Sequence, residues 1–217
     1  GAGESRCIEP IGQFVRIFVE PIIDYLEHTQ STDDQIRLVV RRYKQRSEWF
    51  ESDNLQRIAE EKSDTPTNRN LVEKRLKQDF YRYLFDQNVD FAIAPQAPTR
   101  RGEVDVLSAK FPDGRRLVLE AKVYDGDNRD VQHVKTGIPQ SARYADDWGE
   151  PVGYCLIYNV ARDTLLEIPG APQLDHLWLV SSLGREIRGV ALNLGIVQPS
   201  SQSIALNTVA VDLKGID

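Results

Sequence analysis

The sequence predicts an α/β fold in which helices flank a mixed central sheet and a helical extension precedes the sheet. Two nearly continuous apolar runs, Val152–Tyr158 and Leu177–Ser182, are typical of strands that are covered on both faces. Leu71–Gln87 and Asp127–Trp148 instead repeat apolar residues at helical spacing. Pro139 is expected to kink the second of these helices or to start another one. Because helical segments alternate with strands along the chain, a layered α/β architecture is favoured.

The N-terminal region is predicted to be helical from about Ile11 to Lys62, where apolar residues recur at helical spacing. Ser31–Asp34 offers capping side chains for a second helix, and Pro21 is expected to kink or break the first. Ser63–Asn70 is polar and is predicted to be a linker. We therefore expect two parts, a helical region with its linker at residues 1–65 and the α/β domain at residues 66–217.

A series of short elements is expected between the two long helices. Val89–Ala94 is predicted to be a strand and Pro95–Arg101 the turn that follows it. Glu103–Ala109 alternates in the manner of a strand, and Pro112–Gly114 is typical of a hairpin turn before a strand at Leu117–Val123. The predicted order is therefore helix, three strands, helix and further strands.

Composition excludes several classes of protein. No apolar run approaches the roughly 20 residues that span a bilayer, and no signal peptide is recognisable, so we expect no membrane partner. Cys7 and Cys155 lie far apart in unrelated contexts, which argues against a disulfide framework and favours a cytoplasmic location. The net charge of −6 argues against a general basic coat for nucleic acid, although affinity for phosphate follows local patches.

The chain contains no methionine, and Gly1–Gly3 resembles an expression scar. We expect the chain to be an excised part of a longer protein whose other domains act as partners. Ile187–Leu213 is predicted to contain two more strands, which extend the sheet or contact such a partner.

Polar side chains converge if the predicted hairpin keeps its register. Strand alternation places Glu103 and Asp105 on one face of the first strand, and Glu120 and Lys122 on one face of the second. Two neighbouring carboxylates repel unless a cation lies between them, and all-oxygen ligation suits Mg²⁺, with Mn²⁺ as a substitute. Such a metal polarises a phosphoryl oxygen and lowers the pKa of a bound water. A lysine beside it can orient that water or stabilise the charge that develops on phosphate.

Asp105, the hairpin and Glu120-Ala121-Lys122 resemble the PD-(D/E)xK superfamily of restriction-endonuclease-like nucleases, with Glu-Val-Asp here in place of Pro-Asp. The resemblance implies a restriction-endonuclease-like core. It also implies that Asp105, Glu120 and the backbone carbonyl of Ala121 hold the metal and that Lys122 positions the attacking water.

Two helices add to the resemblance, which covers roughly Leu71 to Ser182. Members of the superfamily often carry a glutamate on the helix before the sheet, and Glu73 is the candidate, as a catalytic residue and a further metal ligand. Many members also have Gln-x-x-x-Tyr on the helix after the third strand. Gln140 and Tyr144 match this pattern on one helix face, Gln140 as a catalytic residue and Tyr144 as a contact to nucleic acid.

Four arginines bracket the hairpin and are candidates for contacts to the nucleic-acid backbone, which position a substrate without reading its sequence: Arg100, Arg101, Arg115 and Arg116. His133 is expected to lie on the surface, and no cluster of His and Cys supports a zinc site.

Simpler interpretations stay open for individual residues. Asp105 and Glu120 could be solvated charges on an antiparallel hairpin, with Lys122 as the ion-pair partner of Glu120. Glu73 could pair with Lys77 at i+4 on the helix surface.

The resulting prediction is a Mg²⁺-dependent nuclease, a hydrolase that acts on DNA rather than RNA. By analogy of fold alone, we expect an effector domain of a bacterial restriction or antiviral defence protein, able to dimerise in order to cut two strands. Neither sequence specificity nor the choice between endonuclease and exonuclease action follows from these residues. One alternative is a catalytically inactive module of the same fold for nucleic-acid binding or protein assembly. Another is an interaction domain that works through residues 11–62 and 187–213.

Overall fold

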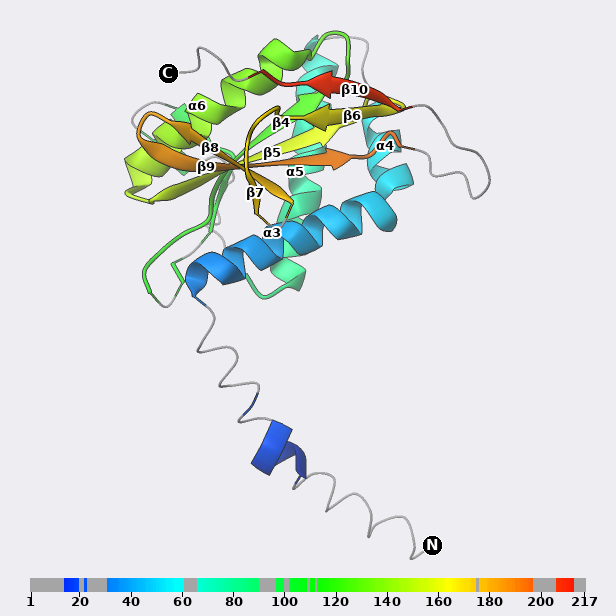
Figure 1. Ribbon diagram of the computed structural model, residues 1–217. Coiled ribbons are helices and arrows are strands. Elements are labelled where there is room, and N and C mark those ends of the chain that lie inside the picture. Colours follow the sequence, from blue (N-terminus) through cyan, green and yellow to red (C-terminus); the bar gives the residue numbers. More distant parts are fainter. Residues whose placement is uncertain are drawn as a thin grey trace, which may run out of the picture. The chain divides into compact units, whose positions relative to one another are not determined.

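The computed structural model describes residues 14–19, 22, 31–60, 66–89, 97–99, 102–108, 110–111, 113–174, 176–196 and 206–212 (Figure 1). Contacts divide the chain into two compact units, residues 1–37 and residues 38–217. The helix α3 (Thr32–Trp49) begins in the first unit and continues in the second. The second unit thus begins before the domain boundary that was predicted between residues 65 and 66.

The first unit holds a π-helix at Val15–Val19 and the first turns of α3. Ser31 Oγ accepts a hydrogen bond from the Asp34 N–H (3.2 Å), as predicted for a helix cap. Pro21, where a kink was predicted, lies outside the described residues. Across all helices of the described residues, none combines the length and the apolarity that crossing a membrane requires.

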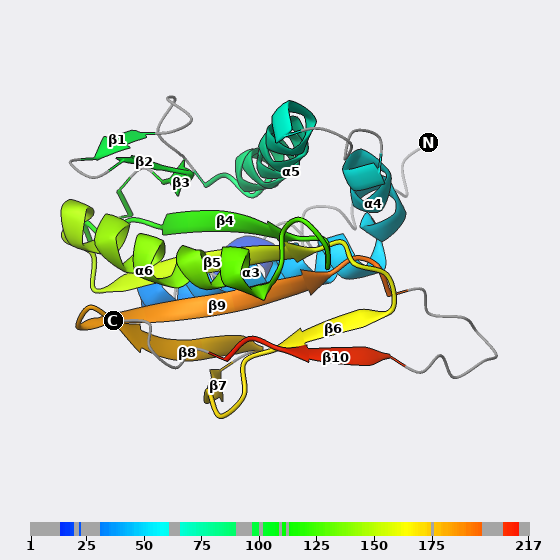
Figure 2. The same cartoon turned by 90° about the horizontal axis from the view of Figure 1, so that it is seen from above.

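A six-stranded mixed sheet forms the centre of the second unit, in the order β3-β4-β5-β9-β8-β7. β4, β5 and β9 are parallel to one another, whereas β3, β8 and β7 each pair antiparallel with a neighbour. Figure 2 shows β4, β5, β9 and β8 following one another across the sheet, with α6 lying over them. The strand bounds are β3 Val106–Leu107, β4 Val118–Tyr124, β5 Val152–Asn159, β7 Gln173–Leu174, β8 Leu177–Ser182 and β9 Arg185–Asn193.

Helices cover both faces of this sheet. The side chains of a central strand alternate between the two faces, so contacts of β5 show which helix lies on each face. On one face, Cys155 of β5 joins a buried cluster that includes Val134 of α6. On the other face, the hydroxyl of Tyr158 donates a hydrogen bond to the Leu76 carbonyl of α5 (3.0 Å). An α/β fold with a mixed central sheet flanked by helices is therefore confirmed. The helices that follow α3 are α4 (Ser52–Glu60), α5 (Pro66–Asp86) and α6 (Val131–Trp148).

Two short strand pairs accompany the main sheet. β1 (Ala97–Thr99) pairs antiparallel with β2 (Gly102–Val104), and β6 (Thr164–Glu167) pairs parallel with β10 (Asn207–Ala210). β6 and β7 were not predicted, because each contains only a few residues and no clear alternation.

The helix boundaries differ from the predicted ones at three places. α5 begins at Pro66 rather than after residue 70, since proline is well tolerated in the first turn, where its missing N–H would have no helical partner. α6 begins at Val131 rather than at Asp127, because the carboxylate of Asp130 accepts hydrogen bonds from the N–H groups of the first turn and so caps the helix. Pro139 lies inside α6 without dividing it.

The strand boundaries differ as well. The turn predicted at Pro95–Arg101 is wrong at residues 97–99, which form β1, while residues 90–94 of the strand predicted before it lie outside the described part of the chain. The strand predicted at Glu103–Ala109 is interrupted at Asp105, between β2 and β3. The two predicted strands of the tail exist as β9 and β10, and β9 lies in the interior of the main sheet.

Gly137 allows α6 to approach β4 and β5 closely. A Cβ atom at this position would lie 2.8 Å from Cγ of Lys122 and 2.8 Å from Sγ of Cys155, closer than unbonded heavy atoms can pack. The aliphatic stem of Lys122 is therefore held between the helix and the sheet.

We predict that Gly137→Ala lowers the free energy of unfolding by about 1–3 kcal/mol, because the added methyl group overpacks a buried contact. Alanine favours a helix over glycine by nearly 1 kcal/mol, so a net loss would isolate the steric effect. Urea unfolding measures the change, with Thr136→Ala as the control on the exposed side of the same helix. A stability equal to or above that of the unmodified protein would contradict the prediction.

Candidate active site

A bend at Asp105 shapes the site. β3 and β4 pair through Val106 and Leu119, and in an antiparallel ladder the next bond on this side of β4 belongs to the Ala121 N–H. The chain bends at Asp105 instead, and Oδ2 of Asp105 accepts the hydrogen bond from the Ala121 N–H (2.9 Å). The N–H and C=O of one strand residue point to the same side, so the Ala121 carbonyl is directed to this edge as well.

The same register brings Asp105 beside Glu120. Glu120 pairs with Cys155 on β5, so its side chain lies on the face of the sheet that α6 covers. Asp105 and Glu120 are buried, with 7% and 5% of their surface exposed. Oε1 of Glu120 lies 2.8 Å from Nζ of Lys122, whereas its buried Oε2 has no hydrogen-bond partner within the described part of the chain. The structure thus brings the three central candidates together.

The Glu120 carboxyl titrates near neutrality. Burial and, to a smaller extent, the charge of Asp105 raise its pKa to about 7, although Lys122 opposes the shift. A buried carboxyl that faces a second carboxylate is expected to behave in this way, because each negative charge makes the other less favourable.

A stripe of α5 faces the bend at Asp105. Glu73, Lys77 and Tyr81 follow one another at intervals of four residues, so they share one side of the helix. Nζ of Lys77 lies 2.5 Å from Oδ1 of Asp105 and 2.7 Å from Oε1 of Glu73. The hydroxyl of Tyr81 donates a hydrogen bond to the Asp105 carbonyl, and burial together with the Asp105 charge raises the pKa of Tyr81 to about 12.

Glu73 is held by two cations. Besides Lys77, NH2 of Arg129 lies 3.5 Å from Oε2 of Glu73. Burial acts to raise the pKa of Glu73, but the charges of Lys77 and Arg129 outweigh it and lower that pKa overall. The ion pair with Lys77 that the spacing allowed is therefore present, and Lys77 also reaches Asp105, which sequence reasoning missed.

A stripe of α6 faces β4 from the other side. His133, Gly137, Gln140 and Tyr144 recur at helical spacing, and Gly137 contacts the stem of Lys122. Burial raises the pKa of Tyr144, and the negative charges of Glu120 and Asp105 add to the shift. The Tyr144 phenol therefore lies within the electrostatic field of both carboxylates. Oε1 of Gln140 is buried and has no hydrogen-bond partner among the residues with a described position.

The prediction that His133 lies on the surface is wrong. The side chain is half-buried, and its Nε2 is buried without a hydrogen-bond partner within the described ranges. Burial and the positive charge of Lys122 lower its pKa, which favours the neutral form of the ring. His133 lies four residues before Gly137, and this spacing could have placed both residues on the same buried side of the helix.

The predicted backbone contacts lie at the turn of the hairpin. Arg115 is exposed there, with Nε 3.5 Å from Oδ2 of Asp113, and Arg116 lies 5.1 Å from the ring centre of Trp148 at the end of α6. These residues line a hollow of about 360 Å³. Arg116 precedes β4 and lies four positions before Glu120, which is roughly 13 Å at the rise of an extended chain. Arg100 and Arg101 lie outside the described residues.

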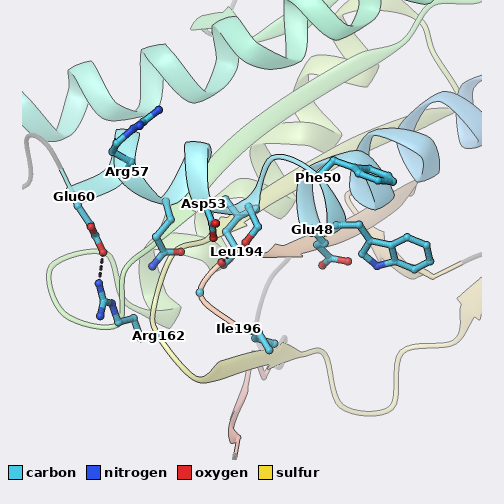
Figure 3. A pocket seen from close by; sticks show the side chains of 12 residues that line it. Glu48, Phe50, Asp53, Arg57, Glu60, Arg162, Leu194 and Ile196 are labelled. Carbon is cyan, nitrogen blue, oxygen red and sulfur yellow. Dashed lines mark hydrogen bonds and ion pairs between the residues drawn. The ribbon is translucent and has the colours of Figure 1, made fainter. Parts of the chain in front are cut away.

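A separate hollow of about 800 Å³ lies between α4 and the chain that follows β9 (Figure 3). An ion pair between Arg162 and Glu60 (2.5 Å) lies on its wall. The described residues that line it include none of the candidate residues, so it is not part of the site.

The oxygen atoms at the hairpin suit a hard divalent cation. The unpartnered Oε2 of Glu120, the carboxylate of Asp105 and the Ala121 carbonyl are oxygen donors of the kind that Mg²⁺ prefers. Within the described part of the chain, no group of three or more His, Cys, Asp and Glu side chains is arranged to hold a metal. The oxygen donors that the bend offers are two carboxylates and one carbonyl, and Mg²⁺ commonly keeps water in its remaining positions.

Comparison of the chain with models of known protein families, with curated proteins and with solved structures gave no match.

We predict that Glu120→Gln stabilises the protein above pH 7 in the absence of divalent metal. The pKa of this carboxyl lies near 4.5 in the unfolded chain and about 7 in the folded one. Its contribution to stability is therefore present below pH 4.5 and is lost as the pH rises through 7. Glutamine mimics the neutral carboxyl, so the free energy of unfolding at pH 8 is expected to rise by about 1–3 kcal/mol, with little change at pH 4.5.

Urea unfolding in EDTA at several pH values measures this effect. Glu167→Gln, at an exposed position on β6, is the control and is expected to change stability equally at every pH. A Glu120→Gln protein that is less stable than the unmodified protein at pH 8 would show that the ionised carboxylate stabilises the fold.

Proposed function

We propose that this protein is a Mg²⁺-dependent nuclease whose central residues are Asp105, Glu120 and Lys122. The observation that carries the proposal is the pairing of two buried carboxylates across the hairpin, one of which keeps a buried oxygen without a hydrogen-bond partner among the described residues. A buried carboxyl that lies in the field of a second carboxylate is unfavourable in its ionised form unless a cation satisfies it. The resemblance of this hairpin to the PD-(D/E)xK pattern gives the proposal its reaction class and a restriction-endonuclease-like core.

Each candidate residue would have a separate role in the reaction. Asp105, Glu120 and the Ala121 carbonyl would hold the metal, with Glu73 as a further candidate ligand. A bound Mg²⁺ polarises a phosphoryl oxygen and lowers the pKa of a water molecule that it binds. Lys122 would donate a hydrogen bond to the attacking water or to the phosphate, because its stem is fixed by Gly137 and its ammonium group lies at Glu120. Gln140 of α6 would act in catalysis together with Lys122.

Substrate contacts are assigned to the hairpin turn and to α6. Arg115, Arg116 and Tyr144 would contact the phosphate backbone, which fixes register without reading sequence. We propose DNA rather than RNA as the substrate, with Mn²⁺ as an alternative metal. The biological setting proposed is cytoplasmic, in an effector domain of a larger bacterial defence protein that dimerises to cut both strands. This setting rests on analogy of fold.

A catalytically inactive module for nucleic-acid binding or assembly is the second candidate, and one observation favours it. The carboxylates of Glu73, Asp105 and Glu120 are matched by the cations Lys77, Lys122 and Arg129, which contact them within the protein. A balanced ion network of this kind can be purely structural. The two candidates differ in whether Mg²⁺ binds and whether phosphodiester bonds break.

We predict that the protein nicks or linearises supercoiled plasmid in the presence of Mg²⁺ or Mn²⁺. Loss of a central metal ligand or of the lysine is expected to lower the cleavage rate by at least about 100-fold, so Asp105→Asn, Glu120→Ala and Lys122→Ala are the test variants. Glu167→Ala is the matched acidic control. Cleavage that persists in all three variants would exclude this site, and a folded protein that binds Mg²⁺ without cleaving would support the inactive module.

We predict that Arg116→Ala weakens substrate binding while leaving the chemical step intact. Arg116 is oriented by Trp148 near the site but not in it, so its loss is expected to raise KM several-fold with an unchanged kcat. The dependence of binding on salt concentration is also expected to fall, because a phosphate contact is lost. Arg57→Ala on α4 is the control. A reduced kcat at unchanged KM would place Arg116 in the chemical step.

A further inference from the structure

Lys77 occupies the position of a cation within the candidate site. Its ammonium group lies between two carboxylates, 2.5 Å from Oδ1 of Asp105 and 2.7 Å from Oε1 of Glu73. The side chain is only 15% exposed. The two carboxylates come from elements far apart in the sequence, α5 and the bend before β3, so this contact also joins those elements.

The amine remains protonated in this environment. Burial acts to lower the pKa of Lys77, but the charges of Asp105 and Glu73 outweigh it, and the pKa is raised overall. The Lys77 charge also reaches Glu120, where it opposes the shift of that carboxyl. Lys77 is therefore a permanent positive charge that acts on all three carboxylates of the site.

The carboxylates of the candidate site are already balanced by protein cations, so an additional cation would create excess positive charge. Above pH 7, where Glu120 is ionised as well, Glu73, Asp105 and Glu120 contribute three negative charges, and Lys77, Lys122 and Arg129 contribute three positive ones, so the named groups sum to zero. A divalent cation added to this set would leave two excess positive charges in a buried region, which is strongly unfavourable. Metal binding at Asp105 therefore requires that a protein cation leave.

Lys77 is the cation that has to leave. Lys122 has its stem packed against Gly137 and contacts Glu120 through Oε1, which leaves Oε2 available. Lys77 instead contacts Oδ1 of Asp105, while the other oxygen of that carboxylate accepts the Ala121 N–H. Both oxygens of Asp105 are thus engaged, and only the contact with Lys77 can be exchanged without breaking the strand edge.

We propose that Lys77 is an internal counter-cation that competes with the divalent metal for Asp105, so that it holds the metal-free site together and weakens its affinity for metal. This inference rests on the proposed function, since it presumes that a metal binds at Asp105. Lys77 is a positioning residue in this account, and its effect is read in metal affinity and stability rather than in cleavage.

The test is calorimetric titration of the full chain with MnCl₂, comparing Lys77→Met with the unmodified protein. Loss of the competing charge is expected to tighten Mn²⁺ binding by at least about tenfold. Even at a high effective dielectric constant, the Coulomb energy between two charges at this distance exceeds the free energy that corresponds to a tenfold change in affinity. Lys74→Met removes a charge from an exposed position on the same helix and is expected to leave the affinity unchanged. Lys77→Arg keeps the charge and is expected to bind Mn²⁺ about as weakly as the unmodified protein.

Two results would overturn the inference, and they differ in what they mean for the nuclease. If Lys77→Met binds Mn²⁺ no more tightly than the unmodified protein, while Asp105→Ala abolishes binding, Lys77 is not a competitor but the metal site stands. If neither the unmodified protein nor a folded Lys77→Met protein binds Mn²⁺, the inference and the proposed metal-dependent function both fail.

Thermal unfolding provides the second measurement, because Lys77→Met could fold poorly without metal. Lys77→Gln keeps a hydrogen-bond donor without the charge. Its Tm in EDTA is expected to lie below that of the unmodified protein, and added MnCl₂ is expected to raise its Tm by the larger amount. Equal shifts in the two proteins on adding MnCl₂ would contradict the proposal.

Discussion

The hydrogen bond from the Ala121 N–H to Oδ2 of Asp105 takes the place of a backbone contact where the β3–β4 ladder ends. A side-chain carboxylate can fill that position only because the chain bends at Asp105, and this bend turns a strand edge into the edge that carries the candidate site. It sets Asp105 beside Glu120, directs the Ala121 carbonyl to the same side, and presents the Asp105 carbonyl to Tyr81 of α5. Bends and bulges commonly serve to re-aim a side chain next to a functional site.

Two helices then enclose this edge with polar stripes rather than apolar ones. The side of α5 that carries Lys77 supplies positive charge to Asp105, and the side of α6 that carries Gly137 presses on the stem of Lys122. Unpaired polar atoms are uncommon in protein interiors, and Glu120, His133 and Gln140 are among the side chains that keep a buried polar atom without a partner in the described part of the chain. Such arrangements lower stability, and proteins tend to retain them where binding or chemistry depends on them.

Local signals predicted much of the fold and the centre of the site. The hairpin followed from its turn, in which Gly114 adopts a φ of +87°, and strand alternation was enough to bring Glu120 and Lys122 to one face. The bend at Asp105 was not predictable, because it depends on a hydrogen bond to a strand 16 residues later. Lys77 was read only as a local partner of Glu73, since its second contact is a tertiary one. Helix propensity and residue spacing predict only the helix that a residue belongs to. Which polar side of that helix becomes buried depends on the element that packs against it in the tertiary structure.

The place of β9 determines how the protein can be divided. This strand comes from residues 185–193, beyond the segment that resembles a nuclease, yet it lies between β5 and β8 in the main sheet. A fragment ending at Ser182 would expose the full hydrogen-bonding edge of β5, an apolar strand that is otherwise covered on both sides. Edges of this kind recruit other chains. A fragment chosen by the Asp105–Lys122 pattern alone is therefore expected to aggregate, and a fragment that keeps β5 paired has to include β9.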